Sequence, residues 1–183
     1  MLKLTGGEFR GRNIDCPPGK DIRPTSSKTR QGIFNTLFSM GFNADGAKIL
    51  ELFAGTGLMS FEALSRGAAS AVLVDTAKTS LDVILKNVEK LKINERVRLV
   101  KSDALAFVSH SDISVYDLIY LDPPYNYMGY GEIISVMMSK ISTNTIVIAE
   151  SDRDITKEVK ESCNVAKVKI WGKSRAFFFQ NNK

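Results

Sequence analysis

The sequence predicts an α/β fold built on a single doubly wound, mostly parallel sheet, with an N-terminal extension in front of it. Between residues 48 and 149, short apolar segments alternate with segments of helical periodicity. The apolar segments do not alternate with polar residues, which favours parallel strands covered by helices on both faces. A chain of 183 residues, of which 44% are hydrophobic, has the size and composition of one globular domain.

The first residues are predicted to form a basic arm. Residues 2–5 and 8–12 alternate in polarity around Gly6 and Gly7, which is typical of a two-stranded hairpin. Residues 1–31 hold seven basic and three acidic residues, whereas the remaining 152 residues hold 18 basic and 17 acidic ones. Positive charge confined to one segment indicates binding to a polyanion, although an ordinary solvated surface would show the same charge.

A helix closes this N-terminal part of the chain. The spacing of apolar side chains predicts it from Thr25 to Gly41, with Ser26 or Ser27 as its N-cap. We therefore divide the chain into a basic extension that would bind a polyanion, residues 1–41, and a main domain, residues 42–183.

The elements of the main domain follow in order from the same spacing. Strands are expected at residues 48–52, 71–75, 97–101, 118–121 and 146–149. Helices are expected at residues 58–65, 77–91, 104–109 and 133–141, and near 155–161. Residues 165–171 and 176–180 flank a turn and predict an antiparallel hairpin at the C-terminal end.

Composition excludes several classes of protein. The chain has two cysteines, Cys16 and Cys163, and one histidine, His110, whereas a structural zinc site needs four sulfur or nitrogen ligands. No stretch approaches the roughly 20 apolar residues that span a bilayer, and the first residues lack the apolar core of a signal peptide. We therefore expect a cytoplasmic protein that binds neither a metal nor a membrane.

A glycine-rich loop at residues 51–57, Glu-Leu-Phe-Ala-Gly-Thr-Gly, follows the first strand of the main domain. It is no P-loop, and Ser60 occupies the third glycine position of a dinucleotide fingerprint. Asp75, twenty residues beyond Gly55, could accept hydrogen bonds from both hydroxyls of a ribose, and Asp103 from an adenine amine. The loop and these acids indicate a cofactor that contains a nucleoside; the alternative is that the acids only cap helices or face solvent.

The tetrapeptide Asp-Pro-Pro-Tyr at residues 122–125 follows the fourth strand. Pro123 and Pro124 fix the backbone, so that the carbonyls of Asp122 and Pro123 are held rigid as acceptors. An acceptor-only carboxylate, a rigid carbonyl and the ring of Tyr125 suit a flat base that carries an exocyclic amine. The alternative is a turn in which Tyr125 covers the core.

Such an amine is a poor nucleophile because its lone pair is delocalised into the ring. Acceptors that hold both of its N–H groups favour the pyramidal nitrogen of the transition state. A sulfonium methyl donor is already electrophilic, so positioning and electrostatic stabilisation suffice for transfer. Asp122 need not be a strong base, since the methylated nitrogen is acidic.

These residues resemble a known group of enzymes. Residues 51–57 together with residues 122–125 are similar to class I S-adenosylmethionine-dependent amino-methyltransferases. Three further motifs resemble the RsmD family of 16S ribosomal RNA guanine-N2 methyltransferases: Gly6-Gly7-x-x-Arg10-Gly11-Arg12, Arg23-Pro24-Thr25 and Arg30-x-x-x-Phe34-Asn35. The resemblance extends over nearly the whole chain.

The resemblance implies a seven-stranded, Rossmann-like sheet whose last strand is antiparallel, and S-adenosylmethionine as cofactor. The implied substrate is N2 of guanine 966 in 16S rRNA, within the small ribosomal subunit or its assembly intermediate, and we expect a monomer. The cofactor-binding residues would be Glu51, Phe53, Ala54, Gly55, Gly57, Asp75, Thr76, Asp103, Ala104 and Asp122. The catalytic residues would be Asp122, Pro123 and Tyr125. The RNA-binding residues would be Arg10, Arg12, Arg23, Thr25, Lys28 and Arg30.

Two positions depart from the family's pattern, and two other functions stay open. Ala77 stands where many relatives carry an acid, and Gln31 stands where the family usually has a glutamate. One alternative is methylation of another exocyclic amine, such as adenine N6 in RNA or DNA; a DNA enzyme generally needs a separate recognition domain. The other is a non-catalytic RNA-binding protein of ribosome assembly, against which the intact tetrapeptide argues.

Overall fold

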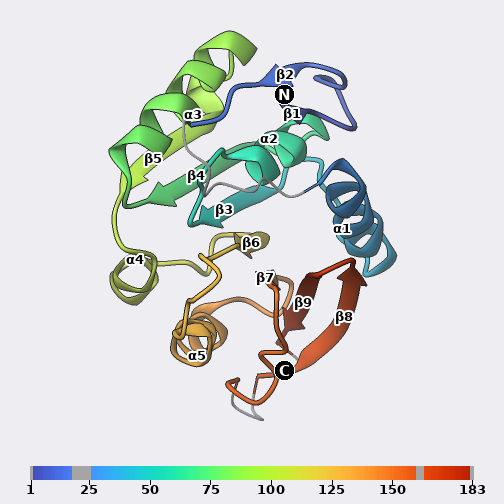
Figure 1. The fold of residues 1–183 in the computed structure, drawn as a ribbon, viewed down its shortest axis with the longest axis vertical. Coiled ribbons are helices and arrows are strands. Elements are labelled where there is room, and N and C mark those ends of the chain that lie inside the picture. Colours follow the sequence, from blue (N-terminus) through green and yellow to red (C-terminus); the bar gives the residue numbers. More distant parts are fainter. Residues whose placement is uncertain (1, 18–25, 160–162, 182–183) are drawn as a thin grey trace.

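A seven-stranded sheet runs through the molecule in the order β5-β4-β3-β6-β7-β9-β8 (Figure 1). The computed structural model describes residues 2–17, 26–159 and 163–181. The strands are β3 (Lys48–Leu52), β4 (Ser70–Asp75), β5 (Val97–Lys101), β6 (Leu118–Leu121), β7 (Ile146–Ser151), β8 (Val165–Trp171) and β9 (Ser174–Gln180). Strands β3 to β7 pair in parallel, and β9 runs antiparallel to both β7 and β8. The predicted doubly wound sheet with an antiparallel last strand is confirmed.

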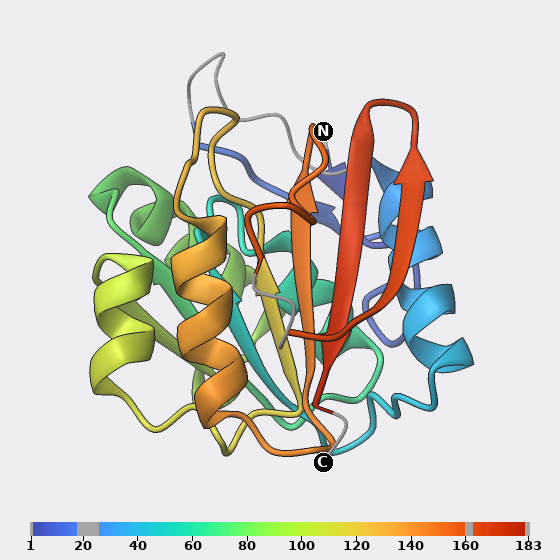
Figure 2. The ribbon, with the colours of Figure 1, turned by 90° about the horizontal axis from the view of Figure 1, so that it is seen from below.

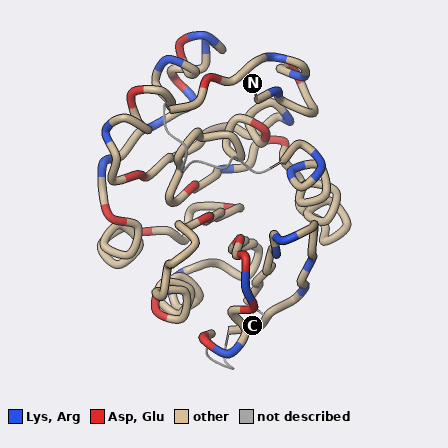
Figure 3. The backbone as a smooth tube through the Cα atoms, viewed as in Figure 1, with Lys and Arg blue, Asp and Glu red and all other residues tan. Residues whose placement is uncertain are grey.

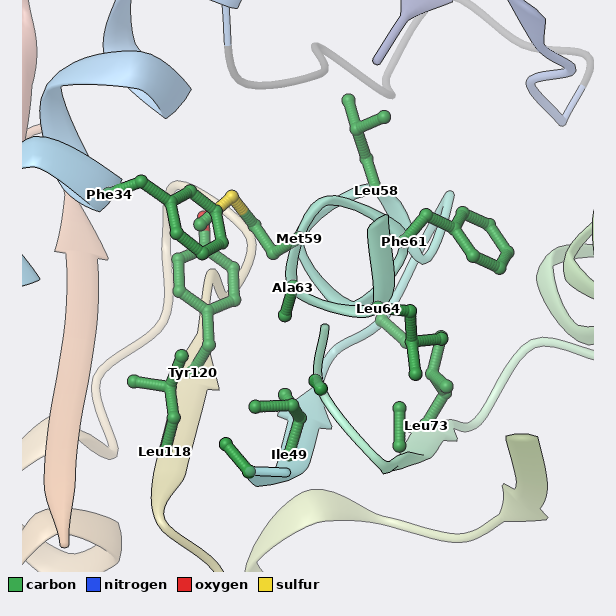
Figure 4. Packing of buried hydrophobic residues seen from close by; sticks show 14 of the residues in the cluster. Phe34, Ile49, Leu58, Met59, Phe61, Ala63, Leu64, Leu73, Leu118 and Tyr120 are labelled. Atoms are coloured by element: carbon green, nitrogen blue, oxygen red, sulfur yellow. The ribbon is translucent and has the colours of Figure 1, made fainter. Parts of the chain in front are cut away.

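Helices cover both faces of this sheet (Figures 1 and 2). One face carries α1 (Ser27–Ser39), α2 (Leu58–Ser65) and α3 (Lys78–Leu91), and the other carries α4 (Ala104–His110) and α5 (Tyr130–Lys140). A 3-10 turn, Asn94–Arg96, leads into β5. Figure 4 shows the α2 layer, where Met59 lies beside Phe34 of α1 and Leu64 faces Leu73 of the sheet. Every side chain of α2 is buried, so the helix that follows the glycine loop is fixed in place.

The N-terminal hairpin differs from the prediction. Strand β1 (Leu2–Lys3) pairs with β2 (Asn13–Ile14), so residues 8–12 form a wide turn rather than a strand. The reason is that the turn packs on α2. Gly7 has a φ of +72°, and a Cβ there would lie 1.7 Å from the carbonyl oxygen of Ser65, so the position requires glycine. The N–H of Glu8 donates to that same carbonyl at 2.7 Å.

The extension shares its hydrophobic core with the main sheet. Leu4, Phe9 and Ile14 of the arm are buried in one cluster with Ile33, Phe34 and Leu37 of α1 and with residues of β3 and β4. Ser26 caps α1, its hydroxyl accepting from the N–H of Thr29 at 3.1 Å, as predicted. The division of the chain at residue 41 stays a prediction.

Two elements near the C-terminal end also differ. Helix α5 begins at Tyr130, three residues earlier than predicted, because the Tyr130 ring is buried and its hydroxyl donates to the carbonyl of Glu150. The helix expected near 155–161 is absent from the described residues 155–159, which form a turn; residues 160–162 lie outside the described part. Among the described residues, no helix is both long and apolar enough to cross a membrane.

Candidate active site

The carboxyl ends of five parallel strands meet along one edge of the sheet, and each end carries a polar candidate residue. Ligands of open α/β sheets bind at this edge. The residues are Glu51 on β3, Asp75 on β4, Asp103 after β5, Asp122 after β6 and Glu150 on β7. Figure 3 shows acidic segments of β3, β6 and β7 side by side in the middle of the sheet. The fold therefore brings the predicted cofactor loop and the predicted tetrapeptide together on adjacent strands.

The glycine loop after β3 turns sharply towards α2. Phe53, Gly55 and Gly57 all have positive φ values, of 54°, 52° and 70°. A Cβ on Gly57 would lie 2.7 Å from Leu73, so this glycine is required by packing below the loop. A Cβ on Gly55 would meet only the carbonyl oxygen of Phe53, at 3.8 Å. The loop is thus tightly packed beneath Gly57 and leaves room for a ligand at Gly55.

Asp75 holds the glycine loop from the end of β4. One of its carboxylate oxygens accepts from the N–H of Gly55 at 2.8 Å, and the other accepts from the N–H of Ala77 at 2.8 Å. Each carboxylate oxygen can accept a second hydrogen bond. The carboxylate therefore positions the loop and retains acceptor sites beside it, which fits the predicted role towards a ribose. Thr76, the next residue, is exposed at the same edge.

Glu51 is buried beneath the loop, with 3% of its surface exposed. Its carboxylate accepts from the backbone N–H of Ser60, in the first turns of α2, at 2.7 Å. Burial raises the pKa of Glu51 to about 7, the hydrogen bonds from Ser60 counteract part of this rise, and the charge of Asp75 adds to it. Glu51 connects β3 to α2 across the loop, so its role at a cofactor would act through the shape of that loop.

Asp122 and Glu150 lie at the ends of the neighbouring strands β6 and β7. Burial raises the pKa of Asp122 well above its usual range, and the nearby carboxylates of Glu150 and Glu51 raise it further. Glu150 is 4% exposed and accepts from the hydroxyl of Ser174 at 2.8 Å and from the hydroxyl of Tyr120. The environment of Asp122 is therefore acidic, which favours a ligand that donates hydrogen bonds.

The loop after β6 presents the rest of the tetrapeptide. Pro123 is buried and Tyr125 is 56% exposed, so the Tyr125 ring is available for stacking. The N–H of Tyr127 donates to the carbonyl of Pro124 at 2.9 Å and closes a turn. From the end of β7, the guanidinium of Arg153 donates to the carbonyl of Tyr127 at 3.0 Å. The end of the tetrapeptide is thus held by this turn, and Arg153 holds the turn in place.

Tyr127 joins this loop to the glycine loop. Its ring contacts Phe53 edge to face at a centroid distance of 5.1 Å, and contacts Tyr130 at 5.3 Å. Sequence reasoning missed Tyr127, Glu150 and Arg153. An aromatic residue two positions after Tyr125 was a weak signal for the first, and an acid directly after the strand at 146–149 was a signal for the second.

Asp103 and Ala104 lie where β5 ends. The carboxylate of Asp103 accepts from the N–H of Ala106 at 2.9 Å and caps α4, and Ala104 is buried. Asp103 itself is exposed, so its capping role leaves acceptor positions at the same edge as Asp75. Both the capping role and the predicted contact with an adenine amine fit this position.

The predicted RNA-binding residues have different surroundings. Arg10, Arg12 and Lys28 are exposed. Arg23 and Thr25 lie outside the described residues. Arg30 is fully buried: its guanidinium pairs with Glu62 at 3.2 Å and donates to the carbonyl of Lys3 at 2.6 Å. The prediction that Arg30 contacts RNA is therefore wrong, because its charge is enclosed between the arm, α1 and α2.

Comparison with known proteins agrees with the fold. A family model described as conserved hypothetical protein 95, the RsmD family, matches residues 2–180. The chain belongs to this family. "Ribosomal RNA small subunit methyltransferase D" of Escherichia coli (strain K12) is 32% identical to this RsmD-family chain over 125 residues, 68% of the chain and 61% of that protein. The chain thus aligns with less than two thirds of that relative's length.

Other relatives of this RsmD-family chain align over greater lengths. The protein of the same name from Haemophilus influenzae is 26% identical over 184 residues, 98% of the chain and 94% of the relative. The solved structure of yhhF from Escherichia coli is 27% identical, with a TM-score of 0.82 over 98% of the chain and 97% of its own. The structure of SMU.776 complexed with SAH is 19% identical, with a TM-score of 0.69 over 94% and 52%, and shows likeness of fold.

Proposed function

We propose that this chain is an S-adenosylmethionine-dependent methyltransferase that modifies the exocyclic N2 of a guanine in 16S rRNA. The single observation that carries the proposal is the adjacency, on strands β3 and β6, of a glycine loop held by Asp75 and a rigid tetrapeptide that begins with Asp122. The names of the relatives support rRNA as substrate. Guanine 966 is the position that the family resemblance implies.

The residues at the sheet edge fit S-adenosylmethionine. The space above Gly55 and the tight turn around it allow close approach to the backbone, and Asp75 offers acceptors for the ribose hydroxyls. Phe53 and Tyr127 supply aromatic surface between the two loops, and Asp103 supplies an acceptor for an adenine amine. When bound, the cofactor would supply an electrophilic methyl group on a sulfonium.

The tetrapeptide would hold the nitrogen that receives the methyl group. Asp122 and the carbonyl of Pro123 accept the two N–H groups of the amine, so that its lone pair points away from the ring plane. The raised pKa of Asp122 makes it a better acceptor for the proton that the nitrogen loses after methylation. Tyr125 would stack on the base, which must be unpaired or flipped to reach this edge.

An assay of methyl transfer tests the proposal. The purified chain, labelled S-adenosylmethionine and either small ribosomal subunits, assembly intermediates or protein-free 16S rRNA are incubated, and the nucleosides are analysed by mass spectrometry. We expect one N2-methylguanosine per particle, with protein-free RNA a poorer substrate. Recovery of N6-methyladenosine or N4-methylcytidine would keep the mechanism and overturn the substrate. RNA binding without any transfer would favour the non-catalytic alternative.

A further inference from the structure

A second basic segment lies at the C-terminal end of the chain. Residues 162–183 contain five basic residues and no acidic ones, and residues 22–44 contain three basic residues, of which Arg30 is buried against Glu62, and no acidic ones. By contrast, residues 45–161, which hold most of the sheet, contain 13 basic and 17 acidic residues. Positive charge is therefore segregated into two acid-free segments that are more than a hundred residues apart in the sequence.

The fold places these two segments side by side. Helix α1 lies against β8, the last strand of the sheet, in both views of the ribbon (Figures 1 and 2). The amino group of Lys167 donates to the hydroxyl of Ser39 at 3.3 Å. A Cβ on Gly32 would lie 2.5 Å from the ring of Trp171, so glycine allows the helix to approach this ring. Figure 3 shows basic segments along both α1 and β8.

The side chains on this surface are suited to a polyanion with aromatic bases. We define the hairpin surface by its members on α1, β8 and the turn that follows: Lys28, Lys167, Lys169, Trp171 and Lys173. Lys28, Lys169 and Lys173 are exposed, and Lys167 and Trp171 are half-buried. Lysines bind phosphates by counterion release, and aromatic rings bind unstacked bases.

The hairpin surface reaches the edge that carries the candidate active site. Strand β8 runs in the same direction as β3 to β7, so its carboxyl end and the turn at Lys173 lie at the carboxyl edge of the sheet. Two contacts join the turn to the end of β7. Ser174 donates to the carboxylate of Glu150 at 2.8 Å, and Arg175 donates to the carbonyl of Asp152 at 2.9 Å.

We infer that the hairpin surface is a second RNA contact, which binds the backbone of the rRNA strand on the β8 side of the active site. This inference rests on the proposed function, because the ligand is the same RNA. Lysines on an edge strand also discourage pairing with another strand. That role does not require an acid-free helix beside the strand or a tryptophan between them.

The test measures RNA affinity against salt concentration for three proteins. The first is the unaltered chain, the second is the Lys167→Gln/Lys169→Gln variant, and the third is the matched control Lys48→Gln/Lys86→Gln, which removes two exposed lysines outside the hairpin surface. Loss of two contacts to single-stranded RNA should lower the magnitude of the slope of log affinity against log salt by about 1.4. On going from 1 M to 0.1 M salt, the variant should therefore gain about 25-fold less affinity than the unaltered chain. The control should keep the slope of the unaltered chain.

The single tryptophan, Trp171, supplies a second readout on the same surface. We expect 16S rRNA to quench its fluorescence in the unaltered chain, and the variant to need more RNA for half-maximal quenching. An unchanged slope in the variant, or tighter binding of an acidic protein than of RNA, would overturn the inference. If the unaltered chain neither binds nor methylates rRNA, the proposed function itself fails, and the two failures are thereby distinguished.

Discussion

The middle of the sheet edge and the two ends of the chain carry opposite charge. Glu51, Asp122 and Glu150 lie on adjacent strands, and the carboxylates of Glu150 and Glu51 add to the rise that burial causes in the pKa of Asp122. The arm and the hairpin surface are basic; the turn of the arm packs on the C-terminal end of α2, and the hairpin surface reaches the edge at the turn that contains Lys173. An RNA backbone is attracted by the ends and repelled by the middle, whereas an exocyclic amine is attracted by the middle. This distribution of charge would let a small chain bind the RNA backbone at its basic ends and direct a base towards its acidic site.

Glu62 is the residue whose removal should disturb the basic end most. Its buried carboxylate pairs with Arg30 and Arg66 and accepts from the N–H of Thr5 at 2.8 Å. Glu62→Ala leaves buried positive charge uncompensated, so the free energy of unfolding should fall by about 3 to 5 kcal/mol. Urea denaturation measures this loss. Glu89→Ala, at an exposed position of α3, is the matched control, and an equal change in both variants would contradict the role of Glu62.

Asp122 is the residue whose removal should disturb the acidic middle most. Asp122→Ala should lower the single-turnover rate by at least 100-fold, about 2.7 kcal/mol, because a preorganised acceptor for the amine is lost. Circular dichroism should be close to that of the unaltered chain, and the rate is measured at saturating S-adenosylmethionine, because Asp122 is also a predicted cofactor contact. Asp117→Ala, at an exposed carboxylate at the opposite edge of the sheet, is the control for the substitution itself. Retained turnover in Asp122→Ala would assign the amine to another acceptor.

The raised pKa of Glu51 gives a pH test of the same region. Its pKa in the folded state, about 7, exceeds its usual value, 4.5, so the folded protein binds more protons than the unfolded one between these values. Stability should therefore fall as pH rises from about 4.5 to 7, by up to about 3 kcal/mol. Glu51→Gln keeps an acceptor for the N–H of Ser60 and should reduce this fall to the part that Asp122 contributes, since the pKa of Asp122 is also raised. If the free energy of unfolding changed with pH in the same way in both proteins, the raised pKa of Glu51 would be refuted.

The sequence predicted the strands of the main sheet, including both edge strands at 97–101 and 165–171, better than the strands of the arm. Strands 48–52, 97–101 and 118–121 and helix 58–65 were predicted with their observed bounds, because apolar runs are bounded there by glycine or polar residues. The two-stranded hairpin of the arm is confirmed, but the bounds of its strands differ from the prediction because its turn is shaped by α2, some 55 residues later.

Contacts between residues far apart in the sequence also explain why some roles could not be predicted. The buried pair of Arg30 and Glu62 joins residues 32 positions apart, and nothing local distinguishes Arg30 from an exposed arginine. The joining of α1 to β8 depends on β8 being added at the edge of the sheet beyond β9, which periodicity does not specify. The glycine loop and the tetrapeptide, in contrast, are local motifs whose place at strand ends follows from their own sequence.

Asp75 is the acid of this edge that holds the cofactor loop. Asp75→Ala removes acceptors for the ribose and also the hydrogen bond to Gly55, so affinity for S-adenosylhomocysteine should fall by about 1.5 to 3 kcal/mol. Isothermal titration calorimetry measures this change. Asp82→Ala, which removes an exposed carboxylate from α3, should bind as the unaltered chain does. Unchanged affinity in Asp75→Ala would move the cofactor to another part of the edge.

The smallest expected effect concerns the arm, because each phosphate contact in an exposed segment contributes little by itself. Arg10 and Arg12 are exposed on the turn that packs on α2, and they are held there without an ion pair among the described residues. Replacing both with glutamine should reduce the log–log salt slope of RNA binding by about 0.7 per lost contact, and should leave cofactor affinity unchanged.

Combining this change with the Lys167→Gln/Lys169→Gln variant decides whether the arm and the hairpin surface bind the same RNA molecule at once. Independent contacts on one RNA predict that the two reductions in slope add, since the two pairs of residues lie on separate elements and share no partner. A combined variant with the slope of either double variant alone would show that the two basic ends bind alternatively. The acidic middle would then be approached from one side at a time.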